Sequence, residues 1–253
     1  MWYKDVKQFK EVSGYEIDGK WYPRVTRIIS IKSKPALDIF YEQVGSISAA
    51  KEITNKSAEE GTKVHEAIEA IMKGEEPVYE DWLKPSVTAF KNFLSFQNIK
   101  VVPEHIERRF VHPDERYAGT IDTLATIDGK FGVLDIKTSA AIYRDYNMQT
   151  AAYIAALGKE FPKLTTRWIL RIDQTQSCAK CKATMRTKGG REKIKTASSS
   201  KKCEAEGHEW QDTKGIIELK EFPFWRDDYG AFLAAKKLWE WENDYWLRQA
   251  GYL

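Results

Sequence analysis

The chain has 253 residues, of which 42% are hydrophobic and 30% charged, and its formal net charge is +3. This balance is typical of a folded globular protein with one sizeable domain and excludes a disordered or fibrous chain. No apolar run approaches the roughly 18 residues of a membrane span, and the stretch Met1 to Lys10 lacks the apolar segment of a signal peptide. We therefore expect a cytoplasmic (intracellular) protein without a membrane partner.

The positive charge is concentrated in one segment. Between Cys178 and His208, nine Lys or Arg stand against three Glu, which gives +6, so the rest of the chain carries +3 minus +6, or −3. Residues 174–213 are therefore expected to form a basic insertion in a mildly acidic body. Its charge favours contact with DNA phosphates, and a solvated loop is the alternative.

Apolar residues at helical spacing mark the first third of the chain. The expected helices cover residues 35–44, with Pro35 in the first turn, and then residues 57–74 and 81–96. Ser57 and Glu60 have capping-box spacing and predict the start of the second of these helices. Residues 21–24 predict a turn or short strand.

Strand patterns begin after Val101. The expected strands cover residues 106–111, 117–127, 131–136, 167–172 and 215–219, and further helices are expected over 143–157 and from Asp227 onward. Asp128-Gly129 predicts a hairpin turn between the second and third strands. Helices, a hairpin, a helix and more strands predict an α/β fold, with a mixed sheet flanked by helices and a helical N-terminal part.

Three charged residues near this hairpin point to chemistry. Asp122 follows one strand, and Asp135 and Lys137 alternate with Ile136 at the end of the next, so Asp135 and Lys137 share a face. Mg²⁺ and Mn²⁺ prefer oxygen ligands, which the two carboxylates and the Ile136 carbonyl supply. Lys137 could then orient or deprotonate an attacking water, or neutralise charge in the transition state. A surface hairpin with an ordinary Asp–Lys pair is the alternative.

Two helical motifs flank these residues. Gly61-x-x-x-His65 lies on the second expected helix, and Gln149-x-x-x-Tyr153 has the i, i+4 spacing that places both side chains on one helical face. Taken singly, each is an ordinary helix pattern, and His65 could simply pack beside its apolar neighbours.

The joint occurrence and order of these motifs resemble the RecB-like branch of the PD-(D/E)XK nucleases. The resemblance covers nearly the whole chain, 1–253, outside the insertion. Within the family, the motif pattern is most similar to those of phage-type exonucleases, the mitochondrial genome maintenance exonuclease and the CRISPR-associated adaptation nuclease. The segments that carry it are Tyr22 to Thr26, Lys34 to Asp38, Gly61 to His65, Tyr117 to Asp122 and Leu134 to Ser139. It implies a single nuclease domain with a restriction-endonuclease-like core.

The resemblance also implies residue roles. His65 would be a metal ligand, since imidazole is acceptable to Mn²⁺. Gln149 and Tyr153 would line the site and contact substrate or backbone. Glu66 and Glu104 are further acidic candidates for contact with the metal or its water, and either could simply be solvated.

The insertion carries its own motif. Cys178-x-x-Cys181 is followed by Cys203 and then His208, and in an intracellular protein this pattern favours a metal over a disulfide. Three thiolates and an imidazole match a closed tetrahedral Zn²⁺ site. The segment between them has little to bury, so a metal would supply much of its folding energy. The alternative is a flexible basic loop with unrelated thiols.

Together these patterns predict a divalent-metal-dependent DNA nuclease, either an exonuclease or a single-strand-preferring enzyme. Its role is expected in DNA repair, recombination, replication or prespacer processing, with single-stranded DNA or duplex ends as the partner. The alternative is a non-catalytic nucleic-acid-binding protein that keeps the nuclease fold and takes its affinity from the zinc module. The intact set of Asp122, Asp135 and Lys137 favours the enzyme, because a protein that had lost catalytic activity would not need to keep all three residues.

Overall fold

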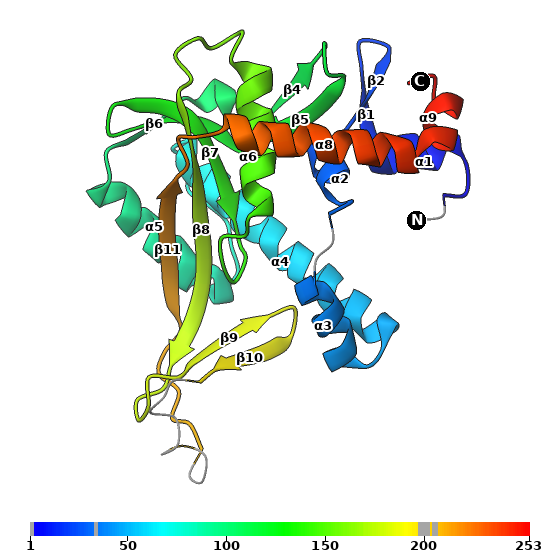
Figure 1. The fold of residues 1–253 in the computed structure, drawn as a ribbon. Coiled ribbons are helices and arrows are strands. Elements are labelled where there is room, and N and C mark those ends of the chain that lie inside the picture. The colour runs from blue at the N-terminus through cyan, green and yellow to red at the C-terminus, as the bar shows by residue number, and fades with distance from the viewer. Residues whose placement is uncertain (1–2, 33–34, 197–202, 204–206) are drawn as a thin grey trace.

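The structure is a computed structural model that describes residues 3–32, 35–196, 203 and 207–253. Lys34 of the predicted N-terminal motif, and Lys201 and Lys202 of the basic insertion, lie outside these residues. Helices flank a mixed sheet, which confirms the predicted α/β class (Figure 1). Among the described residues, none of the helices combines the length and apolar character needed to cross a membrane.

The N-terminal third is mainly helical, as predicted. Its helices are α1 Val6–Ser13, α2 Val25–Ile29, α3 Pro35–Val44, α4 Ile47–Met72 and α5 Lys84–Phe96, with a 3-10 turn at Asp81–Leu83. A small hairpin of β1 Gly14–Ile17 and β2 Lys20–Pro23 confirms the strand expected near residues 21–24. The helix expected at Pro35 begins there.

One sheet organises the rest of the chain. Its central strands are β3 Ile99–Val101, β6 Thr123–Ile127, β7 Lys130–Lys137, β8 Thr166–Ser177 and β11 Lys214–Glu221. Only β7 and β8 pair in parallel among these strands, and α6 Asp145–Leu157 supplies the crossover that a parallel pair requires. A separate ladder joins β4 Arg108–His112 to β5 Tyr117–Ile121. The expected C-terminal helix is divided into α8 Arg226–Glu242 and α9 Asp244–Gln249.

Strand β7 is buried on both faces. Val133 packs in an apolar cluster with α6 and α8, whereas Leu134 and Ile136 pack with α4 and α5 on the other face. A strand covered on both sides reads as a nearly continuous apolar run, which is what the sequence shows before Asp135. The end of β7 therefore emerges between helices from both layers.

The helix that carries His65 is longer than the sequence predicts. It begins at Ile47, where the Ser46 side chain caps the first turn by accepting a backbone N–H at 3.3 Å. The capping-box assignment of Ser57 and Glu60 is therefore wrong, because both lie inside α4. The added N-terminal part of α4 is mostly exposed, so it lacks the apolar spacing that marked the remainder.

Asp122 lies at a break, whereas the pattern over residues 117–127 predicts one strand. It is the single residue between β5 and β6, which belong to different ladders. Its carbonyl accepts the Glu107 N–H at 2.9 Å, and its carboxylate accepts the Ile136 N–H at 2.5 Å. The bend therefore directs this side chain across the hairpin to the end of β7.

The predicted turn between β6 and β7 is confirmed. Asp128 and Gly129 have φ angles of 49° and 81°, the left-handed pair that a two-residue hairpin of this kind requires. The tight turn fixes the register of β6 on β7 and so the position of Asp122 relative to Asp135.

Part of the predicted insertion, 174–213, forms regular strands. Because β8 continues to Ser177, the insertion begins at Cys178 and ends before β11. It contains an antiparallel hairpin, β9 Thr184–Lys188 and β10 Arg191–Lys195, which the sequence analysis did not predict. Lys and Arg occupy alternate positions of these strands, where apolar residues usually mark a strand. The hairpin reaches back toward α3 and α4 (Figure 1).

Candidate active site

Two of the predicted catalytic side chains lie together at the end of β7. Asp135 is only 1% exposed, and the Lys137 ammonium lies 2.6 Å from its Oδ2 atom. Ile136, between them, packs into the core on the α4 side, as alternation along a strand predicts. The Lys137 ammonium also lies 5.0 Å from the centre of the Tyr146 ring. This end of β7 therefore presents an acid and a base on one face.

The break between β5 and β6 brings Asp122 to the same place. Its Oδ2 accepts the Ile136 N–H, and its Oδ1 lies 4.0 Å from His65 Nδ1. The backbone N–H of Ile136 is therefore used to hold Asp122, while its carbonyl stays a predicted metal ligand. Residues far apart in the sequence thus meet at one point.

Gly61 allows α4 to approach this point. A Cβ atom on Gly61 would lie 2.9 Å from Thr138 Oγ1, closer than real Cβ contacts, so any larger residue would push the helix away from the segment after β7. His65 follows one turn later and faces Asp122. The predicted Gly61-x-x-x-His65 motif therefore has a packing reason as well as a chemical one.

Glu107 is a site residue that the sequence analysis missed. His65, Glu107 and Asp122 each offer a ligand atom, and the three atoms lie within 4.8 Å of one another. Glu107 stands just before β4 with φ of 50°, held by the N–H bond to the Asp122 carbonyl. No signal in the sequence pointed to it, because Glu107 falls inside the expected strand 106–111, whereas Glu104 precedes that strand; in the structure β4 begins only at Arg108.

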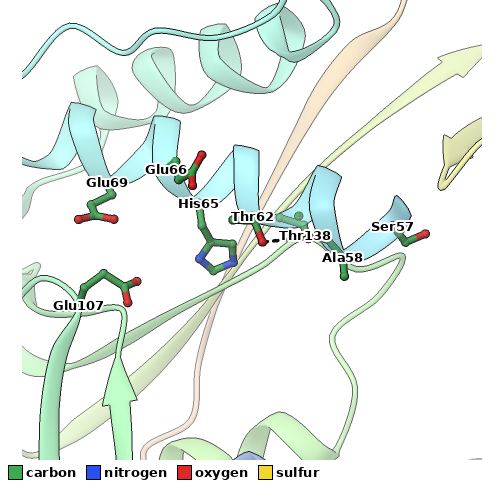
Figure 2. Close-up of a pocket in the computed structure, with 9 residues that line it drawn as sticks. Ser57, Ala58, Thr62, His65, Glu66, Glu69, Glu107 and Thr138 are labelled. Carbon is green, nitrogen blue, oxygen red and sulfur yellow. Dashed lines mark hydrogen bonds between the residues drawn. The ribbon is translucent and has the colours of Figure 1, made fainter. Parts of the chain in front are cut away.

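The two acidic candidates named from the sequence have different positions. Glu66, Glu69 and Glu107 line a pocket of 510 Å³ with His65. Figure 2 shows Glu107 reaching toward Glu69 and His65, whereas Glu66 points away from Glu107. Glu104 lies in an exposed 3-10 turn and is absent from both the pocket lining and the trio of possible ligands in the described residues.

Gln149 and Tyr153, the predicted pair on α6, are linked to Asp135 by hydrogen bonds. Gln149 Nε2 donates to Asp135 Oδ1 at 3.3 Å and to the Tyr153 hydroxyl at 2.6 Å. The Tyr153 ring packs edge-on against Phe110, 5.1 Å between centres, and the residue is 2% exposed. Tyr153 thus lies behind Gln149 and holds its side chain by a hydrogen bond, and the expectation that the pair contacts substrate or backbone stays a prediction.

The chain has no match among known proteins in two comparisons. No family model matches it, and no curated protein matches its sequence.

The charges of the site fit a cation with oxygen and nitrogen ligands. Burial raises the pKa of Asp135 to about 6, although Lys137 opposes this change. The Lys137 ammonium, 2.6 Å from Asp135 Oδ2, pairs with this buried carboxylate oxygen. Burial lowers the pKa of His65 to about 4, and its imidazole is therefore neutral and able to bind a metal. A neutral imidazole with carboxylates is a set of donors that could hold a divalent metal ion.

A second possible metal site lies in the insertion. Cys178, Cys181, Cys203 and His208 each offer a ligand atom within 4.8 Å of the others, and the three cysteines are buried free thiols. The Cys178 and Cys203 sulfurs are 3.8 Å apart, which is too far for a disulfide. The structure thus assembles the predicted Cys₃His group, which could bind a metal.

Proposed function

We propose that this chain is a divalent-metal-dependent DNA nuclease with a RecB-like PD-(D/E)XK core. The observation that carries the proposal is the buried meeting of Asp122, Asp135 and Lys137 beside His65. Gathering such charges without a ligand costs several kcal/mol, so a fold that holds them together favours a use for them. Their order along the chain is the order of the family that the sequence resembles.

The ligands of the catalytic metal are assigned from their positions. His65, Asp122 and Glu107, whose ligand atoms lie within 4.8 Å of one another, would hold Mg²⁺ or Mn²⁺. Asp135 and the Ile136 carbonyl are further ligands that the family resemblance implies. When bound, the ion supplies a Lewis acid for the phosphate and a water of lowered pKa. The chain itself contributes the orientation of these donors, which the Ile136 N–H and Gln149 fix by hydrogen bonds.

Lys137 acts as a fixed positive charge. Burial lowers its pKa, but the carboxylates of Asp135 and Asp122 outweigh burial and hold the pKa above the usual value of 10.5. The ammonium is therefore protonated at neutral pH. Of the roles open to it from the sequence, this state favours orienting the attacking water and neutralising charge on the phosphate in the transition state over deprotonating the water.

The substrate and biological role are proposed from the family resemblance. We expect DNA, as single strands or duplex ends, and an exonuclease or single-strand-preferring mode of cutting. Repair, recombination, replication or prespacer processing are the processes that need such an enzyme.

Zinc is the metal proposed for the Cys₃His group. A tetrahedron with Zn–S bonds of about 2.3 Å has sulfur–sulfur edges of about 3.8 Å, and the Cys178–Cys203 separation is 3.8 Å. The Cys181 sulfur lies 3.3 Å from His208 Nδ1, near the shorter edge that a nitrogen ligand gives. The residues could therefore hold Zn²⁺ with little rearrangement.

The test is cleavage of end-labelled single- and double-stranded DNA with Mg²⁺ or Mn²⁺. The parent should release labelled products, and Asp135→Asn should lose at least about a hundredfold in rate, because it removes a metal ligand without changing core volume. Lys137→Ala should lower kcat more than Mn²⁺ affinity. Glu104→Gln is the matched acidic control and should cut like the parent.

Thermal melting of each variant separates loss of chemistry from loss of fold. If Asp135→Asn stays folded and cuts at the parent rate, the site is misassigned. If the parent binds DNA but never cuts it under these conditions, the proposal of a nuclease fails and the non-catalytic alternative replaces it.

A further inference from the structure

The hairpin of the insertion has a strongly basic face. Arg186 pairs with Lys193, and Lys188 pairs with Arg191, across the β9–β10 ladder. Directly paired residues share a face, and so do alternate residues along a strand. Lys195, two residues after Lys193, therefore joins the same face. Five cations thus line one side of the hairpin, and the opposite side carries none in the described strands.

The tip of this hairpin is fixed against the helix that carries His65. The Gly189 N–H donates to Glu60 Oε2 at 2.9 Å. Gly189 has φ of 62°, and a Cβ there would lie 2.3 Å from Ser57 Oγ and 2.4 Å from the Ile53 carbonyl oxygen. Only glycine allows this contact. The basic face is therefore held at a set distance from the candidate active site rather than free in solvent.

Two hairpin cations border a pocket that opens on the active site. Arg186, Lys188 and Tyr143 line a cavity of 410 Å³, which is also lined by His65 and Lys137. The Arg186 guanidinium is already held by Asp173, at 2.8 and 2.9 Å, and by the Thr138 carbonyl at 3.2 Å. Its charge is therefore largely satisfied within the protein.

Lys188 differs from Arg186 in this respect. In the described part of the chain, no hydrogen bond or ion pair within 4.0 Å holds its ammonium. The side chain is half-buried, and burial lowers its pKa, with Glu60 opposing. A half-buried cation without a bound partner, facing a pocket beside the catalytic residues, is available to a phosphate.

The same cavity is lined by an aromatic ring. Tyr143 is 47% exposed, and its ring meets Tyr146 edge-on at 5.8 Å between centres. Tyr146 in turn underlies the Lys137 ammonium. An exposed ring beside a cation is the arrangement that binds unpaired nucleotides, because a base in a duplex already has both of its faces stacked.

We propose that the pocket between β9 and the start of α6 binds one unpaired nucleotide of a DNA strand, with its phosphate on Lys188 and its base on Tyr143. The proposal rests on the proposed nuclease function and deepens it by naming single-stranded DNA as the substrate. It also gives the insertion a role at the active site, since β9 delivers one wall of the subsite.

The test compares binding and cleavage of one labelled oligonucleotide of about 15 nucleotides with those of its blunt duplex. Binding is measured with Ca²⁺, which takes the same oxygen ligands, and cleavage with Mn²⁺. Lys188→Ala and Tyr143→Ala should each raise Kd and KM for the single strand roughly tenfold. Values of kcat should change little, because neither residue touches the reacting atoms.

Conservative and distant variants serve as controls. Lys188→Arg and Tyr143→Phe keep the charge and the ring, so both should bind like the parent. Lys100→Ala removes the same charge from exposed β3, at the other end of the sheet, and should also match the parent. Melting curves establish that Lys188→Ala and Tyr143→Ala are folded.

The outcomes separate the subsite from the nuclease function. Cleavage by the parent with unchanged single-strand Kd in Lys188→Ala and Tyr143→Ala overturns the subsite and leaves the nuclease intact. Equal weakening of single-strand and duplex binding by Tyr143→Ala also overturns it. If the parent cuts nothing but its single-strand binding still depends on Lys188 and Tyr143, the subsite stands and the nuclease function fails.

Discussion

At the scale of single residues, the candidate site contains titratable side chains whose pKa values the fold shifts away from their usual values. Burial raises the pKa of Asp135 to about 6, and partial burial with the nearby Asp122 charge raises the pKa of Glu107 to about 7. Burial also lowers the pKa of His65 to about 4. Each shift disfavours the charged form, because burial removes water from the ionised group.

These shifts set the pH dependence of metal binding. Asp135 and Glu107 must lose their protons to bind Mn²⁺, and they lose them only as pH rises through about 6 and about 7. His65 is already neutral above about 4 and adds little to this dependence. We therefore expect the rise in Tm caused by Mn²⁺ to be larger at pH 7.5 than at pH 5.5. An equal rise at both pH values contradicts the assigned ligands.

Without metal, the two carboxyl groups make the folded protein less stable, not more stable, as pH rises. Asp135 and Glu107 bind more protons folded than unfolded between their unfolded and folded pKa values, so they lower stability as pH rises from about 4 to about 7. His65 binds fewer protons folded than unfolded and acts in the opposite direction between about 4 and 6.5. The two carboxyl groups outnumber the imidazole, and above pH 6.5 only their effect remains.

Glu107 should be a metal ligand although the sequence did not single it out. Glu107→Gln keeps the size of the side chain and removes its charge, so Mn²⁺ affinity should fall roughly tenfold. Glu104→Gln is the matched control three residues earlier, on an exposed turn, and should leave the affinity unchanged. Isothermal titration with Mn²⁺ measures both. If the two variants bind Mn²⁺ with the same affinity, Glu107 lines the pocket but is not a metal ligand.

At the scale of elements, the insertion joins a possible metal centre to a docked hairpin. The Cys178 N–H donates to the Ala183 carbonyl at 2.8 Å, just before β9 begins at Thr184. The Cys178–Ala183 hydrogen bond thus fixes the base of the hairpin. The hydrogen bond from Gly189 to Glu60 of α4 fixes its tip. Among its described residues, the insertion has one small apolar cluster of its own, around these thiols. Its order should therefore depend on the metal.

Elemental analysis of the purified protein should find about one zinc per chain, bound by three sulfurs and one nitrogen. The double variant Cys178→Ser, Cys181→Ser should lose this zinc yet keep the two apolar clusters of the main body and their melting transition. The chain has three Cys, too few for a Cys₄ iron–sulfur cluster within one chain. A brown protein that contains stoichiometric iron would overturn the zinc assignment.

At the scale of the whole molecule, charge is divided between the insertion and the body. The body supplies carboxylates that attract a divalent cation, and the hairpin supplies cations that attract a polyanion. The two regions meet at the pocket that contains both Lys137 and Lys188. Under the proposed function, a DNA strand would approach along the basic face and place a phosphate over the acidic site.

DNA binding should weaken as salt increases, because each phosphate contact releases counterions. Reversal of Lys180, Lys182, Arg191 and Lys193 to Glu should make this dependence shallower, by about 0.7 in log–log slope per lost single-strand contact. The structure divides the four, since only Arg191 and Lys193 lie on the basic face of the hairpin. The Arg191, Lys193 double variant should therefore account for most of the change. An unchanged slope in the quadruple variant contradicts a role for the insertion in DNA binding.

The sequence by itself determined the elements whose signals are local. The Asp128-Gly129 turn, the alternation of Asp135 with Lys137 and the start of α3 at Pro35 depend on neighbours within a few residues, so each could be predicted. The Cys₃His group could also be predicted, because its spacing is itself the signal.

Only the tertiary structure decided the features that depend on distant contacts. The break at Asp122 exists because Glu107 and Ile136 donate to it from other segments, and no local pattern reveals such bonds. The first turns of α4 and the β9–β10 hairpin could not be predicted, because their residues are mostly exposed and polar. Such segments lack the regularly spaced apolar residues that mark a helix or a strand in a sequence. Glu107 and Lys188 join the site for the same reason, since their partners lie across the fold and are invisible along the chain.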